Sequence, residues 1–221
     1  MRREILLVLG LCTLMSLVAC SSGLARLGLA SSADAPAAQA DARRSGRERA
    51  RIHTELAEGY FQLQNYPVAL DEVGIALAAD SQYGPAHNVK GLIHLALEQN
   101  DQAEAAFRPA TQIDPADSDA RNNYGILLCR TGRVDAAVDQ WVEAARNPLY
   151  ATPEQSHVNA GLCLLGARRA TEARQLLVDY GQRRGLSAAG QQLLTQIEAE
   201  LAGATQGERA PVGAAGGGET R

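Results

Sequence analysis

The sequence predicts an all-α protein built from stacked helix pairs, and two observations support this fold class. Hydrophobic residues make up 46% of the 221 residues, yet only two are Phe and one is Trp, which suits closely packed helices. A pattern of residue sizes also recurs, because Gly125 is followed at fixed spacing by Ala137, Trp141 and Ala144. Shifting these numbers back by 34 gives Gly91, Ala103, Phe107 and Ala110, and a second shift of 34 gives Ala57, Ala69, Val73 and Ala76. Shifting them forward by 36 gives Gly161, Ala173, Leu177 and Tyr180.

A period near 34 residues, with small residues where two helices cross and a bulky residue in the second helix, is typical of tetratricopeptide repeats. We therefore expect a right-handed tetratricopeptide-repeat superhelix over residues 47–202. The predicted repeats cover about 50–83, 84–117, 118–151 and 154–185, and a capping helix covers 187–202. Two extra residues before the fourth repeat fall in the connector NPLYATPE, since Gly161 to Ala173 spans the same distance as Gly125 to Ala137.

The first 19 residues have the pattern of an export signal. Arg2 and Arg3 precede an apolar run, from Ile5 to Val18, that is too short to span a bilayer comfortably. Residues 17–20, LVAC, resemble a bacterial lipobox, which implies cleavage before Cys20 and lipidation of its thiol. Because Ser rather than Asp follows the cysteine, the resemblance also implies anchoring at the periplasmic face of the outer membrane. The alternative is an ordinary cleaved signal with an incidental cysteine.

Two segments outside the repeats have compositions that predict disorder. Residues 20–46 are rich in Ser, Ala, Gly and Asp without a periodic apolar stripe, and we expect a flexible linker there. Residues 203–221 are expected to be a disordered tail. A cluster of arginines between Arg43 and Arg51 ends the linker, and either contacts membrane phosphates or is a solvated helix start.

Two of the four cysteines remain once the signal segment, which contains Cys12, is removed and Cys20 is assigned to lipid. Cys129 and Cys163 form an even pair in a chain with an export signal. Each falls in the first helix of a repeat, and neighbouring first helices pack side by side. We predict a Cys129–Cys163 disulfide, the alternative being two buried thiols.

The first helices of such arrays line a concave face, which predicts a binding groove for a partner polypeptide. Positions three before, one after and four after each small anchor residue point inward, and Asn residues two before the anchor are further candidates. The predicted groove residues are Glu58, Phe61, Asn88, Leu92, Leu95, Asn122, Asn123, Ile126, Asn159, Leu162 and Leu165. Apolar side chains would take those of an extended or helical peptide while Asn amides satisfy its backbone. The alternatives are that the Leu residues belong to the core and that the Asn residues bond within the stack.

Other classes of function find little support. The formal charge of −4 gives no basic face for nucleic acid. His53, His87, His94 and His157 are scattered, with no ligands at zinc spacing, and no phosphate loop or nucleophile elbow occurs. We expect no cofactor, no metal and no enzymatic activity; a repeat-bearing peptidase regulator dependent on His87 or His94 is the alternative of that class.

The central stretch resembles a known family. NNYGILLC at 122–129, NPLY at 147–150, TPEQ at 152–155 and NAGLCLL at 159–165 are similar to the PilW/PilF type IV pilus biogenesis lipoproteins. The resemblance covers about 47–185 and implies an outer-membrane lipoprotein that acts as a pilotin for the pilus secretin or stabilises assembled pili. Its implied partner is the secretin or another pilus-assembly protein. The alternative is a general periplasmic tetratricopeptide scaffold for another envelope process, such as cell-wall synthesis.

Overall fold

The computed structural model describes residues 34–207, and within this range the chain forms nine helices and no strand. The helices are α2 (Asp34–Gln62), α3 (Tyr66–Ala79), α4 (Gly84–Ala96), α5 (Asn100–Ile113), α6 (Ser118–Arg130), α7 (Val134–Arg146), α8 (Pro153–Gly166), α9 (Ala170–Arg184) and α10 (Ala188–Gly207). The chain divides into two units, residues 1–45 and 46–221. The described part of the first unit is the beginning of α2.

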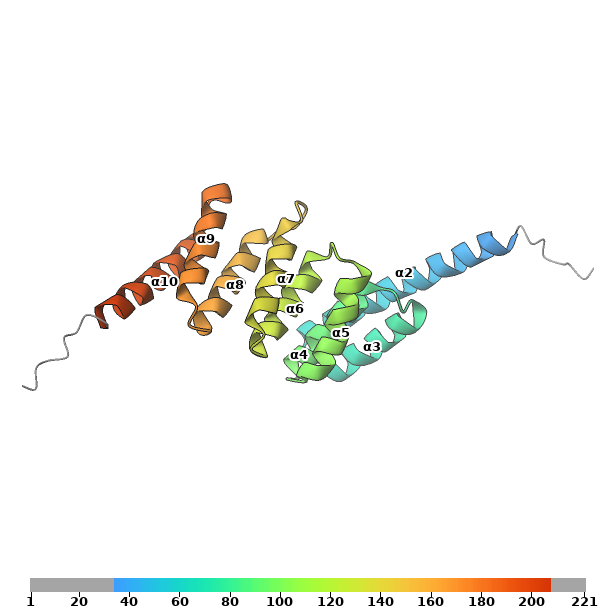
Figure 1. Cartoon of the computed structure of the whole chain (residues 1–221). Helices are drawn as coiled ribbons and strands as arrows, with labels where there is room; N and C mark the ends of the chain where they lie inside the picture. The colour runs from blue at the N-terminus through green and yellow to red at the C-terminus, as the bar shows by residue number, and fades with distance from the viewer. Residues whose placement is uncertain (1–33, 208–221) are drawn as a thin grey trace, which may run out of the picture. The chain divides into compact units, whose positions relative to one another are not determined.

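The second unit is a stack of antiparallel helix pairs (Figure 1). Within a repeat, α4 packs on α5, α6 on α7 and α8 on α9, while the first helices α4, α6 and α8 also contact one another in succession. The predicted fold class, an all-α tetratricopeptide-repeat superhelix, is confirmed.

The turn inside each repeat has the same backbone conformation. Gln64, Glu98, Gly132 and Arg168 all have positive φ, between 58° and 76°. In each case the next residue donates its N–H to a carbonyl five residues earlier, as Arg133 does to Leu128 at 2.8 Å. This is the Schellman ending of a helix, which favours glycine at the left-handed position. Only repeat three has glycine there.

Small anchor residues let the two helices of a repeat approach closely. A Cβ atom on Gly125 would lie 2.7 Å from the Trp141 ring, and one on Gly91 would lie 2.5 Å from the Phe107 ring. The Trp141 indole also donates a hydrogen bond to the carbonyl oxygen of Asn122 at 3.1 Å. The small-then-large pattern in the sequence is therefore the contact that fixes each helix pair.

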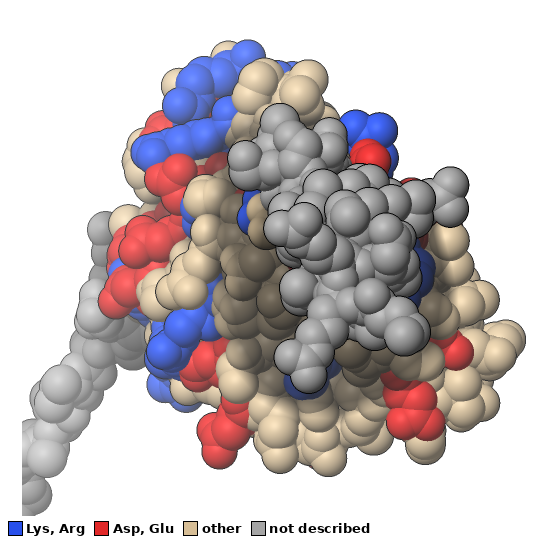
Figure 2. Space-filling view, turned by 90° about the vertical axis from the view of Figure 1, so that its right-hand side faces the viewer, with Lys and Arg blue, Asp and Glu red and all other residues tan. Residues whose placement is uncertain are grey.

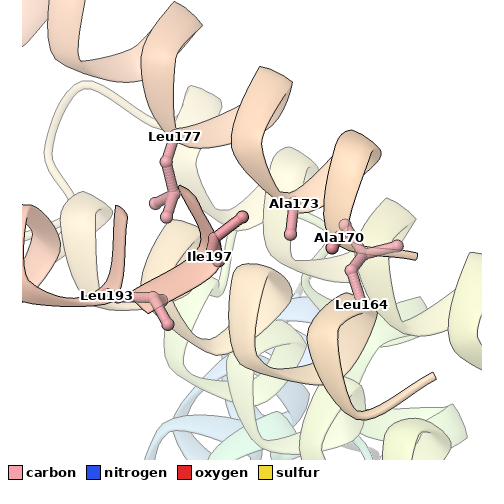
Figure 3. Packing of buried hydrophobic residues seen from close by; sticks show 6 residues of the cluster. All are labelled: Leu164, Ala170, Ala173, Leu177, Leu193 and Ile197. Carbon is pink, nitrogen blue, oxygen red and sulfur yellow. The ribbon is translucent and has the colours of Figure 1, made fainter. Parts of the chain in front are cut away.

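The last helix covers the end of the stack. Leu193 and Ile197 of α10 pack with Leu177 of α9 and Leu164 of α8 in one buried apolar cluster (Figure 3). The Glu154 carboxylate at the start of α8 accepts a hydrogen bond from the Ser187 backbone N–H at 2.8 Å, next to the first residue of α10. The outer side of α10 is polar, as expected of a capping element.

The structure corrects two predicted boundaries. Residues 34–46 are helical, although the sequence analysis assigned them to a flexible linker. The physical reason is that this segment is rich in Ala and Arg, which are strong helix formers even without an apolar stripe. The capping helix likewise continues to Gly207 rather than ending at 202. The signal segment 1–19, Cys20, the linker up to residue 33 and the tail from 208 lie outside the described residues.

Candidate functional site

Asparagines link the first helices of three repeats. The Asn123 side chain of α6 donates to Asn88 Oδ1 of α4 at 3.1 Å, and the Asn159 side chain of α8 donates to Asn122 Oδ1 of α6 at 3.0 Å. Gln155 in turn donates to Asn159 Oδ1 at 2.9 Å. The asparagines therefore bond within the stack. Asn88 and Asn122 accept these bonds through Oδ1, and within residues 34–207 their Nδ2 groups donate no hydrogen bond. Two amide donors are therefore left on this surface.

The apolar groove residues differ in exposure. The side chain of Leu162 is 50% exposed, while Leu92, Ile126 and Leu165 are half-buried. Leu95 is only 8% exposed and packs in a core cluster with Phe107 and other residues. The prediction that Leu95 lines the groove is wrong, because the next repeat covers it.

The groove positions of repeat one also differ from one another. Phe61 is half-buried, and its ring lies 5.9 Å from that of Tyr66. Glu58 is exposed, and partial burial, followed by the negative charge of Glu55, raises the pKa of its carboxyl group. The equivalent positions of the other repeats hold Leu92, Ile126 and Leu162, so repeat one presents a carboxylate where they present an apolar side chain.

A shallow hollow of about 290 Å³ opens between α6 and α8. Its lining is mostly apolar and combines predicted groove residues with residues that the sequence analysis did not select. The lining residues are Ile126, Cys129, Arg130, Trp141, Asn159, Leu162 and Cys163. We call this the α6–α8 hollow. Its size suits one bulky apolar side chain of a bound polypeptide.

A disulfide bond lies in the wall of the α6–α8 hollow. The sulfur atoms of Cys129 and Cys163 are 2.03 Å apart and their Cα atoms are 6.0 Å apart. This is the pair that the sequence singled out. The bond joins the first helices of repeats three and four, and so fixes the spacing of the two helices that form the hollow.

Arg130 and Trp141 are the lining residues that sequence reasoning missed. Arg130 donates to the Leu95 carbonyl oxygen of α4 at 3.2 Å, which holds its guanidinium on this surface. The repeat pattern marks Trp141 only as a packing residue, yet it also lines the hollow. The repeat pattern could have suggested Trp141, since it fills the gap left by Gly125, but no sequence signal marks Arg130.

The histidines have ordinary structural partners. His87 Nε2 donates to the Ser81 carbonyl oxygen at 3.0 Å, and His94 Nδ1 lies 2.7 Å from Gln99 Oε1. Among the residues described, no three or more His, Cys, Asp or Glu side chains are arranged to hold a metal ion. None of the helices in the described part of the chain is long and apolar enough to cross a membrane.

Comparison with known proteins defines the class first. A tetratricopeptide-repeat family model matches residues 88–156, and the chain is a tetratricopeptide-repeat protein. It is 30% identical over 142 residues to an "Uncharacterized protein" of Haemophilus influenzae, and the match covers 63% of this chain and 78% of that protein. The chain belongs to the same family as this Haemophilus influenzae protein.

Pilus proteins are also among the relatives. The chain is 29% identical over 133 residues to the type IV pilus assembly protein PilF of Pseudomonas aeruginosa, covering 59% of this chain and 52% of PilF. It therefore spans about half the length of that relative.

Two solved structures of pilus proteins have a similar fold. The crystal structure of PilW, a widely conserved type IV pilus biogenesis factor, matches with a TM-score of 0.61 and 29% identity over 70% of each chain. The structure of Pseudomonas aeruginosa PilF matches with a TM-score of 0.63 and 22% identity, over 73% of this chain and 74% of that one, which supports the fold alone.

Proposed function

We propose that the protein is a non-catalytic scaffold of type IV pilus assembly, and that it acts by holding a segment of another pilus protein in its groove. The observation that carries this proposal is the match to PilF and PilW, both at 29% identity, over 59% and 70% of this chain. The α6–α8 hollow and the free amide donors of Asn88 and Asn122 suit a polypeptide ligand.

The proposed partner is the pilus secretin, and the proposed role is to promote its localisation and multimerisation or to stabilise pili. We further propose that lipid on Cys20 anchors the protein to the periplasmic face of the outer membrane, as the lipobox resemblance implies. The predicted export signal and the Cys129–Cys163 disulfide agree with an oxidising compartment outside the cytoplasm.

A site-specific photo-crosslinker tests the partner. Placed at Leu162, in the α6–α8 hollow, it should capture the secretin in living cells of the parent bacterium. The matched control is the same crosslinker at Leu149, which is 89% exposed but lies outside the hollow, and it should capture little or none. Equal capture at both positions, or capture of cell-wall enzymes at Leu162 alone, would contradict the secretin as partner.

Deletion of the gene tests the role. We expect loss of secretin multimers or of surface pili, restored by the wild-type gene but not by Leu162→Glu, which places a charge in the hollow. Cys20→Ala should release the protein from the outer membrane. Normal pili together with a division or cell-wall defect would instead favour the general envelope scaffold.

A further inference from the structure

A second hollow, of about 310 Å³, lies away from the groove at the ends of α7 and α9 and the start of α8. It shares no residue with the predicted groove. Its lining residues are Val142, Ala145, Arg146, Pro153, His157, Tyr180, Arg183 and Arg184. Three of the eight are arginines and none is acidic, although the whole chain carries a formal charge of −4. We call it the basic hollow.

The positive charge of the basic hollow is only partly neutralised. Arg146 forms an ion pair with Glu143 of its own helix. Arg183 donates to the backbone carbonyl oxygen of Asp179 at 2.9 Å, and within residues 34–207 neither Arg183 nor Arg184 forms an ion pair with a carboxylate. Figure 2 shows basic side chains gathered at the top of that view. Arginines in the last turn of a helix commonly interact with the helix dipole. The dipole does not explain why the arginines of α7 and of α9 line the same hollow.

Two ring side chains form the inner wall. His157 and Tyr180 are both 8% exposed, and their rings lie 4.2 Å apart. His157 Nδ1 donates to the Pro153 carbonyl oxygen at 3.0 Å, which fixes the tautomer of the neutral ring and leaves Nε2 without a protein partner in the described residues. The Tyr180 hydroxyl has none there either. Two polar groups therefore remain available in a hollow lined by three arginines, although the charge of the nearby Glu154 carboxylate also acts on both rings.

We infer that the basic hollow binds a phosphate group. A guanidinium group can bind two phosphate oxygens at once through a pair of N–H donors. Arg183 and Arg184 together carry two positive charges, which exceeds the single negative charge of a carboxylate ligand. The Tyr180 hydroxyl donates to a further oxygen. Nε2 of neutral His157 accepts from the P–OH group of inorganic phosphate or a monoester, which a phosphodiester lacks near neutral pH. The phosphate could be free in solution or belong to a phosphodiester lipid headgroup.

The test is a titration of the full chain, held in detergent, with two probes. Inorganic phosphate represents the free ion, and glycerophosphoglycerol represents the headgroup of phosphatidylglycerol. We expect saturable binding at millimolar concentration with shifts in the NMR signals of the His157 and Tyr180 rings. Tighter binding of inorganic phosphate would assign the site to a free phosphate or monoester, and tighter binding of the diester would assign it to a lipid headgroup.

Matched variants separate the site from general charge. R183Q/R184Q should weaken binding of the preferred probe by more than tenfold, and Tyr180→Phe, which keeps the ring stack, by a few-fold. The control R49Q/R168Q removes the same charge from two exposed arginines outside the hollow and should change affinity by less than twofold. Failure of both probes to bind, or equal loss in the two double variants, overturns the inference. Neither outcome affects the proposed pilus function, since the Leu162 crosslink reports on a different surface.

Discussion

Two neighbouring joints of the stack use equivalent positions in different ways. Joint 2–3 is the packing of α4 against α6, and joint 3–4 is that of α6 against α8. Shifting Cys129 back by 34 gives Leu95, and shifting Cys163 back by 36 gives Leu127. The two leucines share one buried apolar cluster, whereas the two cysteines form a covalent bond. The disulfide therefore stands where the preceding joint has an ordinary core contact.

The joints also differ in their ion pairs and connectors. At joint 2–3, Glu104 accepts two hydrogen bonds from Arg133 at 2.8 Å each and one from the Tyr124 hydroxyl at 3.1 Å. The equivalent arginine at joint 3–4, Arg169, pairs with Asp135, which is not equivalent to Glu104 and is 83% exposed. The connector before α6 is residues 114–117, while the one before α8 is residues 147–152. The joint with the longer connector and the weaker polar contact is the one that carries the disulfide.

The largest effect should come from removing the disulfide. It closes a loop with a sequence separation of 34, so C129S/C163S should lower the unfolding free energy by about 3 to 4 kcal/mol. C129L/C163L should lose clearly less, because it restores the apolar pair of joint 2–3. Chemical denaturation measures both variants, and wild-type protein under reducing conditions is the control. Equal stability of C129S/C163S and the wild type would show that joint 3–4 does not depend on the bond.

The next effect concerns the helix pairs on either side of joint 3–4. Gly125→Ala forces a Cβ atom to 2.7 Å from the rigid Trp141 ring and should cost about 2 kcal/mol. Gly161→Ala meets only Leu193 and Leu177 methyl groups at 3.2 and 3.3 Å, which can shift, and should cost about 1 kcal/mol or less. Trp141→Phe added to Gly125→Ala should recover part of the loss. The same denaturation experiment decides, and equal costs at the two glycines would contradict the ring contact as the cause.

A smaller effect is expected for the polar network of joint 2–3. Hydrogen bonds from Arg133 hold the pKa of Glu104 down at about 2, below the ordinary value of 4.5. Because the folded-state pKa is depressed, the stabilisation is complete above pH 4.5 and is lost as the pH falls toward 2. Glu104→Gln should cost about 1 kcal/mol near neutral pH, with the gap from wild type closing in that range. Asp135→Asn is the matched control, and a gap that does not change with pH would contradict the ion pairing.

The smallest effect should appear in the turns of the two repeats that meet at joint 2–3. Glu98 in repeat two and Gly132 in repeat three occupy the same left-handed position, with φ of 58° and 76°. Glu98→Gly should stabilise the protein by about 0.5 to 1 kcal/mol, and Gly132→Ala should destabilise it by about 1 kcal/mol. Thermal unfolding of both variants measures the change in stability relative to the wild type. A change of the same sign in both variants would contradict a preference for glycine at this left-handed position.

The sequence predicts the repeats well because each depends on local contacts. The spacing of Gly125 and Trp141 is enough to locate α6 and α7, since both residues belong to one helix pair. The extension of α2 to Asp34 was missed because helix propensity, rather than an apolar stripe, forms it. In the candidate site, the sequence brings Ile126, Asn159 and Leu162 onto one surface, but it places Leu95 there too. Burial of Leu95 and the position of Arg130 depend on how far one repeat overlaps the next, which no single repeat encodes.

The packing of α10 sets where this array can change in length. A Cβ atom on Gly161 of α8 would already meet Leu193 of α10 at 3.2 Å, and the outer side of α10 is polar. A further helix pair added after α10 would have no apolar surface of α10 to pack against. A duplicated helix pair placed between α5 and α6 would instead contact repeat helices on both sides. An inserted helix pair is therefore easier to accommodate inside this stack than beyond its last helix.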